Sequence, residues 1–98
     1  MKPKLSSCPV TMTATVLSDI WTMLIMYSLL DKPMRFCELE RGLKGISTRT
    51  LTNKLKIIEE EKLVIKDGEG FYHPTERGRG LKPVHKAMRA YAEKYLVG

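Results

Sequence analysis

The sequence has little cysteine and no obvious arrangement of metal ligands. Its two cysteines, Cys8 and Cys37, are far apart, belong to no CxxC pair and have no neighbouring histidine. Zinc sites and the disulfide frameworks of small secreted domains need closely spaced ligands or several paired cysteines. We therefore expect no metal and no cofactor, and a reducing, cytoplasmic setting.

The chain also lacks an uncharged apolar run of membrane-spanning length. Its most apolar stretch, residues 10–30, contains Asp19 and six Ser or Thr residues. A carboxylate at the centre of a span costs about 2.5–3.5 kcal/mol. Residues 1–9 have too few apolar side chains for the core of a signal peptide. We expect neither a membrane partner nor export.

Catalytic constellations are missing as well. Neither His73 nor His85 has an acidic or cysteine partner at the spacing of a metal site or a catalytic triad. We interpret both histidines as structural or surface groups and predict that the protein is not an enzyme. A thiol-based redox enzyme is a remaining alternative, and it would need Cys37 as the resolving partner of Cys8.

Positive charge is in excess. Seventeen Lys and Arg residues against eleven Asp and Glu residues give a net charge of +6. Residues 35–56 hold six basic and two acidic residues, whereas residues 57–70 hold two basic and five acidic residues. The excess makes nucleic acid, an anionic membrane surface or an acidic protein the first candidate partners.

A chain of 98 residues supports one hydrophobic core, so residues 1–98 form a single domain. Periodicity and turn signals predict its elements in order. Helices are expected at residues 11–17, 20–30, 37–43, 48–61 and 75–96, and strands at residues 34–36, 63–66 and 71–73. The apolar helix at 20–30 should be buried on most of its faces, and Trp21, Phe36 and Cys37 should face the core.

The helix that follows Ser47 is the best candidate for a binding element. Leu51, Leu55 and Ile58 repeat at helical spacing and define an inward stripe. The opposite face carries Arg49, Asn53 and Lys56, with Thr50 and Thr52 on its flanks. Arg can pair with guanine and Asn with adenine, while Lys suits phosphate. A merely solvated polar face is the alternative interpretation.

The order of elements and several motifs resemble the HxlR group of winged-helix transcriptional regulators, which is related to the MarR regulators. The similarity extends from Cys8 to about Tyr95. The matching segments are CPV at 8–10, DIWTMLI at 19–25, DKPMRFCEL at 31–39, GISTRTLTNKL at 45–55, LV at 63–64 and PTERGRGLKPV at 74–84.

The resemblance implies an α+β, mainly α winged helix-turn-helix fold with a short two-stranded wing and an added C-terminal dimerisation helix. Its parts would be an N-terminal dimerisation segment at 8–17, the helix-turn-helix at 37–61, the wing at 63–73 and the last helix at 75–96. It also implies a homodimer that binds double-stranded DNA and regulates transcription. The expected DNA-binding residues are Ser47, Thr48, Arg49, Thr50, Thr52, Asn53, Lys54, Lys56, Arg35 and Arg77.

Cys8 matches a cysteine that senses oxidants or electrophiles in some members of the resembling group. Lys2 and Lys4 would add local positive charge, which favours a thiolate. The alternative is that Cys8 is a small apolar residue at a dimer seam. Two departures from the group are Lys62, where glycine is usual, and a short wing with two acids between residues 67 and 70.

The last expected helix carries an apolar stripe. Its members are Leu81, Val84, Met88, Tyr91 and Tyr95. This spacing predicts a homodimer interface. Thr75 should cap the helix, and Pro83 should kink it.

A different class of function is also open. The same winged-helix surface could dock on a protein of the transcription machinery instead of on DNA. Strong salt dependence of duplex DNA binding separates the two interpretations.

Overall fold

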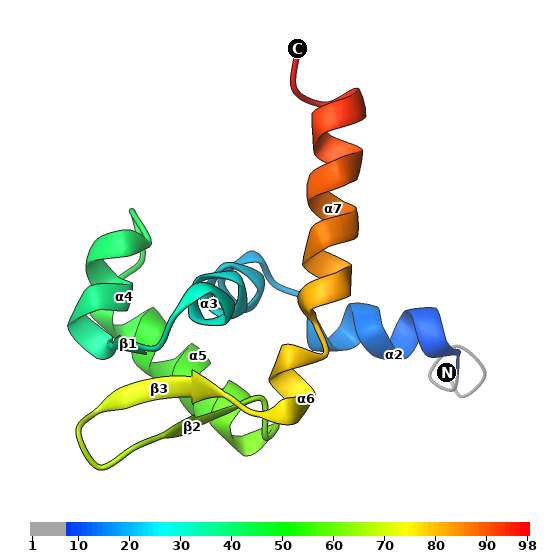
Figure 1. Ribbon diagram of the computed structural model, residues 1–98. Helices are drawn as coiled ribbons and strands as arrows, with labels where there is room; N and C mark the ends of the chain where they lie inside the picture. Colours follow the sequence, from blue (N-terminus) through cyan, green and yellow to red (C-terminus); the bar gives the residue numbers. More distant parts are fainter. Residues whose placement is uncertain (1–7) are drawn as a thin grey trace.

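The structure is a computed structural model that describes residues 8–98. Its elements follow the predicted order, and most boundaries differ from the prediction by one or two residues. In chain order they are α2 (Pro9–Val16), α3 (Ile20–Asp31), β1 (Met34–Arg35), α4 (Phe36–Gly42), α5 (Thr48–Glu60), β2 (Val64–Lys66), β3 (Phe71–Pro74), α6 (Glu76–Arg79) and α7 (Lys82–Tyr95) (Figure 1). The predicted mainly helical winged-helix fold is confirmed.

The strands form one antiparallel sheet in the order β1-β3-β2. Arg35 pairs with Phe71 at one side of β3, and Ile65 pairs with His73 at the other. The hairpin of β2 and β3 is the predicted two-stranded wing, and β1 adds a third strand at its edge. Gly70 closes the hairpin turn at φ 91°, a conformation that glycine adopts without steric cost.

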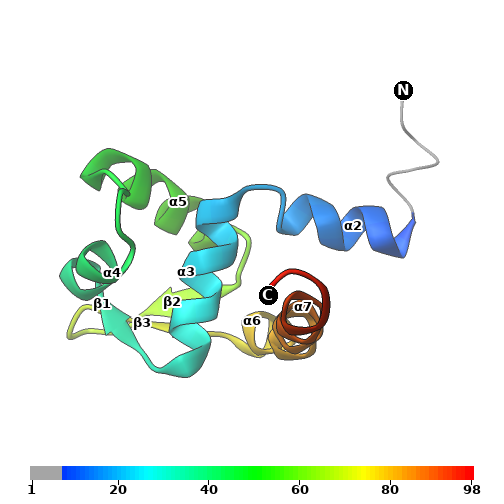
Figure 2. The same ribbon diagram turned by 90° about the horizontal axis from the view of Figure 1, so that it is seen from above.

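Helix α3 lies between the helix-turn-helix elements and the C-terminal helices. In both views α4 lies on one side of α3, and α2 and α7 lie on the other (Figures 1 and 2). Ile25, Met26 and Leu29 of α3 are buried in the core. Ile20 and Tyr27 remain exposed, so the expectation that this helix is buried on most of its faces holds only for part of its surface.

The single helix expected at residues 75–96 is two helices. Thr75 caps α6 by accepting a hydrogen bond at Oγ1 from the Gly78 amide at 3.1 Å. The helical conformation ends at Arg79 and resumes at Lys82. Pro83 lies in the first turn of α7, where its missing N–H costs nothing. The predicted kink at Pro83 was therefore wrong: a second helix starts there.

Gly78 allows α6 to approach the start of β2 closely. A Cβ atom at this position would lie 2.2 Å from the backbone oxygen of Leu63, a distance that no side chain tolerates. Because Gly78 has no side chain, α6 can pack directly against the backbone at this end of the wing.

Lys62 occupies a left-handed conformation at the end of α5, with φ 65°. Its amide donates to the Glu59 carbonyl at 3.0 Å, and the Leu63 amide donates to the Ile58 carbonyl at 2.9 Å. This pair of bonds is the Schellman motif that usually has glycine at the left-handed position. The departure at Lys62 therefore leaves the expected helix end in place.

The remaining core predictions are mixed. Trp21 and Phe36 are partly buried against the core. Cys37 is exposed, so its expected core position was wrong: it lies near the start of the short helix α4, where Leu39 alone is buried.

Across residues 8–98, no single helix has both the length and the hydropathy to cross a membrane. The helices Pro9–Val16 and Ile20–Asp31 are long and apolar enough only when they are taken together, and their axes are bent by 84° relative to each other.

Candidate nucleic-acid interface

Local hydrogen bonds define the start of α5. Ser47 has extended backbone angles and is the N-cap, and its Oγ accepts a hydrogen bond from the Thr50 amide at 3.0 Å. The same hydroxyl lies 2.9 Å from Oγ1 of Thr50. Capping fixes where the helix begins and leaves its positive dipole end exposed, which is favourable near phosphate.

The inward stripe of α5 is confirmed. Leu51, Leu55 and Ile58 are buried in the core, so the opposite face of the helix must point to solvent. Thr48 on this helix also donates a hydrogen bond from its hydroxyl to the Glu40 carboxylate of α4. Core packing and this contact together hold the two helices of the helix-turn-helix in one arrangement.

Arg49, Asn53 and Lys56 lie on the outer face of α5 and are exposed. Within residues 8–98, none of their side chains makes a hydrogen bond or ion pair with another part of the chain. Thr52 is exposed too, but its hydroxyl donates to the Thr48 carbonyl at 2.8 Å. The three longer side chains are therefore free to meet a ligand.

Lys54 is placed differently from these three. Its Nζ lies 3.2 Å from Oδ2 of Asp19, and both side chains are partly buried. Asp19 is also the N-cap of α3, because its Oδ1 accepts a hydrogen bond from the Thr22 amide at 3.0 Å. Partial burial acts to raise the pKa of Asp19, but the hydrogen bonds from Thr22 and Lys54 outweigh it and lower the pKa.

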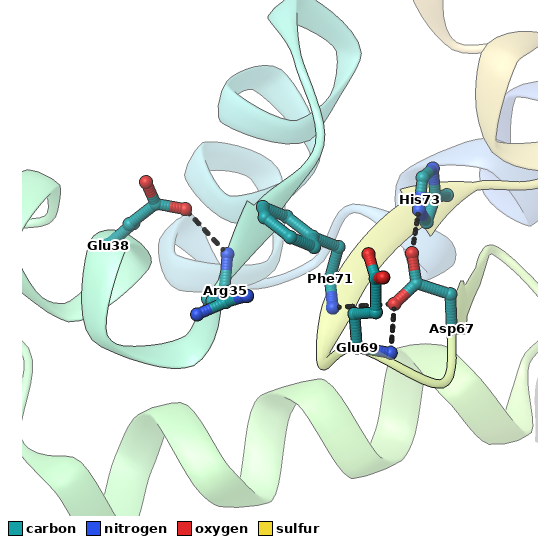
Figure 3. Close-up of polar contacts among 6 residues, drawn as sticks. All are labelled: Arg35, Glu38, Asp67, Glu69, Phe71 and His73. Atoms are coloured by element: carbon teal, nitrogen blue, oxygen red, sulfur yellow. Dashed lines mark hydrogen bonds and ion pairs between the residues drawn. The ribbon is translucent and has the colours of Figure 1, made fainter.

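The wing is organised around Asp67 (Figure 3). Its Oδ1 accepts hydrogen bonds from the amides of Glu69 and Phe71 at 2.9 and 3.0 Å. Its Oδ2 lies 2.7 Å from Nε2 of His73, an acidic partner that the spacing of a metal site or a triad did not indicate. The bond from His73, followed by that from the Phe71 amide, lowers the pKa of Asp67. The turn at residues 67–70 contains two carboxylates, those of Asp67 and Glu69, and no basic side chain.

The two arginines predicted outside α5 do not lie together. Arg35 is on β1 beside Phe71, near the hairpin turn, and its guanidinium lies 4.6 Å from the centre of the Phe71 ring. Its amide donates to Oε1 of Glu38 at 2.9 Å (Figure 3). Arg77 is exposed on α6, beyond the other end of β3. The sheet therefore separates these two positive charges.

Cys8 is the N-cap residue of α2 and is a half-buried free thiol. The backbone amides of Thr11 and Val10 at the helix N-terminus lower the pKa of its thiol. This environment favours the thiolate, which is the reactive form. Lys2 and Lys4, the predicted source of positive charge, lie outside the described residues.

The apolar stripe of α7 is partly exposed. Tyr91 and Tyr95 are 58% and 63% exposed, their rings are 5.0 Å apart, and Met88 is exposed beside them. Leu81 is only 8% exposed and belongs to the core, so it offers little surface to the predicted dimer interface. Val84 is partly buried against the same core. The exposed stripe thus consists of Met88, Tyr91 and Tyr95.

Sequence reasoning missed two features. Asp19 precedes a long apolar run, which is a recognisable capping signal, but nothing in the sequence pairs it with Lys54. His85 is buried and neither of its ring nitrogens has a hydrogen-bond partner within the described chain. The only sequence signal for His85 was its spacing of four residues from Leu81. In residues 8–98 no three His, Cys, Asp or Glu side chains are grouped to hold a metal ion.

Comparison with known proteins adds two lines of information. The model of the HxlR-like helix-turn-helix family matches residues 16–98. The Bacillus subtilis HTH-type transcriptional regulator YodB is 30% identical over 95 residues, which cover 90% of this chain and 85% of YodB. The uncharacterized HTH-type transcriptional regulator YdeP of the same organism is 31% identical over 94 residues, which cover 90% of this chain and 73% of YdeP.

The solved structures that this chain resembles are also structures of regulators. The quinone-bound form of YodB from B. subtilis has a TM-score of 0.81 at 31% identity, covering 90% of this chain and 99% of that one. The reduced form of the redox regulator HypR has a TM-score of 0.80 at 29% identity, covering 89% and 92%. The overall fold is therefore one that this chain shares with known regulators. The chain belongs to the HxlR-like helix-turn-helix family and is a transcriptional regulator of the helix-turn-helix type.

Proposed function

We propose that this protein acts in the cytoplasm as a homodimer that binds specific sites in double-stranded DNA, with α5 in the major groove. One observation carries the proposal. Arg49, Asn53 and Lys56 share an exposed face of a helix whose other face is anchored in the core, and no other part of the described chain engages their side chains. A rigid helix with free polar side chains of these types suits base reading.

The types of side chain divide the contacts along α5. Arg49 donates two hydrogen bonds to a guanine edge, and Asn53 pairs with an adenine edge. Lys56 contacts phosphate, as do the exposed amides after Ser47. Glu59 and Glu60 follow at the end of the helix, where phosphate would repel them. Only the first turns of α5 therefore enter the groove.

The other predicted contacts are subordinate. Ser47 and Thr48 lie at the helix start next to phosphate, and Thr50 and Thr52 flank the reading face, where a threonine methyl can meet thymine. Lys54 contributes less because Asp19 already pairs with it. Arg35 and Arg77 contact flanking phosphates on separate parts of the site.

The test begins with identifying the operator, by sequencing the genomic fragments that the purified protein retains. Arg49→Ala and Asn53→Ala should each weaken operator binding by about 1–3 kcal/mol and relax the preference at one base pair. Lys86→Ala removes an exposed positive charge from α7 on the face away from Met88, Tyr91 and Tyr95 and is the matched control, with unchanged affinity. Parent-like affinity in both α5 variants would contradict the proposed reading face.

Dimerisation rests on the exposed stripe of Met88, Tyr91 and Tyr95 on α7, together with the N-terminal segment at 8–17. Two-fold symmetry would place two copies of α5 on successive half-sites, about 34–36 Å apart on one face of the duplex. Operators should therefore be pseudo-palindromic. The interface would also cover apolar side chains that a monomer leaves in water.

Cys8 provides a route for regulation. Its thiolate is favoured at the N-terminus of α2, and solved structures of similar proteins include a diamide-treated YodB and an oxidized HypR. Cys8 precedes α2 and Cys37 lies on α4. These two helices lie on opposite sides of α3 (Figure 2), so a disulfide between the two cysteines would join two protomers. Two thiols would lose two protons and two electrons to an oxidant such as diamide, which becomes the hydrazine.

A second candidate is docking of the same surface on an acidic protein of the transcription machinery, favoured by the net charge of +6. DNA binding predicts that affinity for duplex fragments falls steeply with salt and differs strongly between sequences. Weak binding that does not distinguish between sequences would favour the protein partner.

A further inference from the structure

A groove of about 640 Å³ lies where the turn after α3 meets the wing and α6. Its apolar lining includes Leu30 of α3, Pro33 of the turn, Ile65 of β2 and Pro74 of β3. Ile65 is 56% exposed, so more than half of this large apolar side chain meets water. None of the proposed DNA contacts and no member of the exposed α7 stripe lines this groove.

Two polar side chains of the wing, Asp67 and His73, also line the groove. They bond to each other, with 2.7 Å between Oδ2 and Nε2 (Figure 3). The other oxygen of Asp67 accepts the amides of Glu69 and Phe71. Three donors from the wing itself therefore already occupy this carboxylate, which reduces its repulsion of another anion.

One edge of the groove is basic. Lys32 and Arg79 line it and are exposed, and Asp31 is the one carboxylate beside Asp67 in the lining. Nη1 of Arg79 donates to the Pro74 carbonyl at 3.0 Å, which holds the guanidinium at the end of β3 and leaves its other N–H groups for a ligand. In residues 8–98 neither Lys32 nor Arg79 forms an ion pair. Their charges are therefore available to an anionic partner.

The other side of β2 is acidic. Glu59 and Glu60 of α5 line a second groove together with Ile65, so this isoleucine lies between basic side chains on one side and carboxylates on the other. The carboxylates of a bound ligand must therefore lie towards Arg79, and its apolar group towards Ile65. A DNA duplex fits this arrangement poorly, because its backbone offers phosphates along both strands and no apolar side chain for the groove.

We propose that this groove docks an acidic segment of a partner protein that carries a large apolar side chain. The apolar side chain packs against Ile65, Pro33 and Pro74. Neighbouring carboxylates of the segment meet Lys32 and Arg79. Segments of this composition are commonly disordered when free and become ordered on a partner. The groove is separate from the outer face of α5, so the inference does not rest on the proposed DNA binding.

The experiment uses a fluorescein-labelled peptide of sequence EEDLFDEE as the probe and the full-length protein without DNA. Fluorescence anisotropy should detect saturable binding that weakens as salt is added. The peptide EEDAADEE has the same charge but lacks the apolar side chains, and it should bind about three- to tenfold more weakly. No saturable binding of EEDLFDEE at millimolar protein, or equal affinity for the two peptides, would overturn the proposal.

Variants locate the contacts. Arg79→Glu and Lys32→Glu turn attraction into repulsion and should each weaken binding of both peptides about two- to tenfold. Ile65→Thr keeps a β-branched side chain that suits a strand and should reduce the preference for EEDLFDEE over EEDAADEE. Arg41→Glu makes the same charge reversal at an exposed site of α4 and is the matched control, with unchanged affinity. Parent-like affinity in both groove charge variants would contradict this docking site.

Amide resonances provide a test without any substitution. On addition of EEDLFDEE, those of Ile65, His73 and Arg79 should shift, and those of Arg49 and Asn53 should stay in place. Shifts confined to α5 would show that the peptide binds the proposed reading face and would overturn the proposal. A duplex that shifts the groove resonances where the peptide does not would make the groove a nucleic-acid surface, with the same consequence. Failure of operator binding alone leaves the peptide result unaffected.

Discussion

Lys54 of α5 and Asp19 at the start of α3 form an ion pair, with Nζ and Oδ2 3.2 Å apart. Because Asp19 also caps α3, the pair links the middle of α5 directly to the N-terminus of the central helix. One lysine of α5 is thus engaged inside the protein, while the next, Lys56, is free at the surface.

This difference predicts unequal roles for the two lysines in DNA binding. Each lysine that contacts a phosphate contributes about 0.9 to the slope of log affinity against log salt concentration. Lys56→Gln should therefore reduce the slope by about that amount, and Lys54→Gln should reduce it much less. Fluorescence anisotropy with an operator duplex at several salt concentrations measures both slopes. Equal reductions would show that Lys54 leaves Asp19 to meet phosphate.

The exposed stripe on α7 predicts a dimer that a buried charge will disrupt. Tyr91→Glu places a carboxylate in the apolar seam, where an unpaired charge is costly, and should give monomers in sedimentation at micromolar concentration. Operator affinity should fall with it, since a monomer holds only one half-site. Ala90→Glu adds the same charge to the opposite face of α7 and serves as the control. A monomeric parent that binds operator tightly would contradict the dimer.

The environment of Cys8 predicts that oxidation releases the operator. Diamide should reduce the operator affinity of the parent and produce a disulfide-linked dimer on a non-reducing gel. Cys8→Ser should remain insensitive, whereas the exposed Cys37 can be replaced by serine to identify the cysteine that Cys8 joins. Equal affinity of oxidised and reduced parent protein would leave Cys8 as a packing residue.

The left-handed conformation of Lys62 predicts a stabilising substitution. Lys62→Gly should raise the free energy of unfolding by up to about 1 kcal/mol, because glycine adopts this conformation without steric cost. Part of the gain is lost to the larger entropy of glycine in the unfolded chain. Glu61→Gly, at the preceding position with φ −78°, should instead destabilise. Urea denaturation of both variants makes the comparison.

The burial of His85 predicts a pH dependence of stability. Its folded pKa lies below the ordinary value of 6.5, so the unfolded chain binds the proton more tightly than the folded chain does. The contribution of His85 to stability is therefore complete above pH 6.5 and declines as the pH falls towards the folded pKa. His85→Phe should flatten this part of the profile and, by removing unpartnered nitrogens, raise stability by about 1–3 kcal/mol. A parallel decline in parent and variant below pH 6.5 would contradict the assignment to His85.

Features that depend on neighbours along the chain could be predicted. The cap at Ser47, the buried stripe of Leu51, Leu55 and Ile58, and the hairpin at residues 67–70 all arise from hydrogen bonds or periodicity within about one to three turns. The outward position of Arg49, Asn53 and Lys56 then follows, because a helix with one buried face exposes the other. Local periodicity is therefore sufficient to predict the candidate reading face.

Features that depend on contacts between distant residues were not predictable. The packing of α6 against the start of β2 depends on how closely Gly78 approaches Leu63, and the burial of Leu81 and His85 depends on where α7 meets α3. Lys54 is withdrawn from the surface by Asp19, which lies 35 positions earlier in the chain. The sequence alone thus determined the elements from α2 to β3 and the polar face of α5, through local backbone and side-chain chemistry. Only the packing of distant elements decided which charges remain free and which apolar and polar groups are buried.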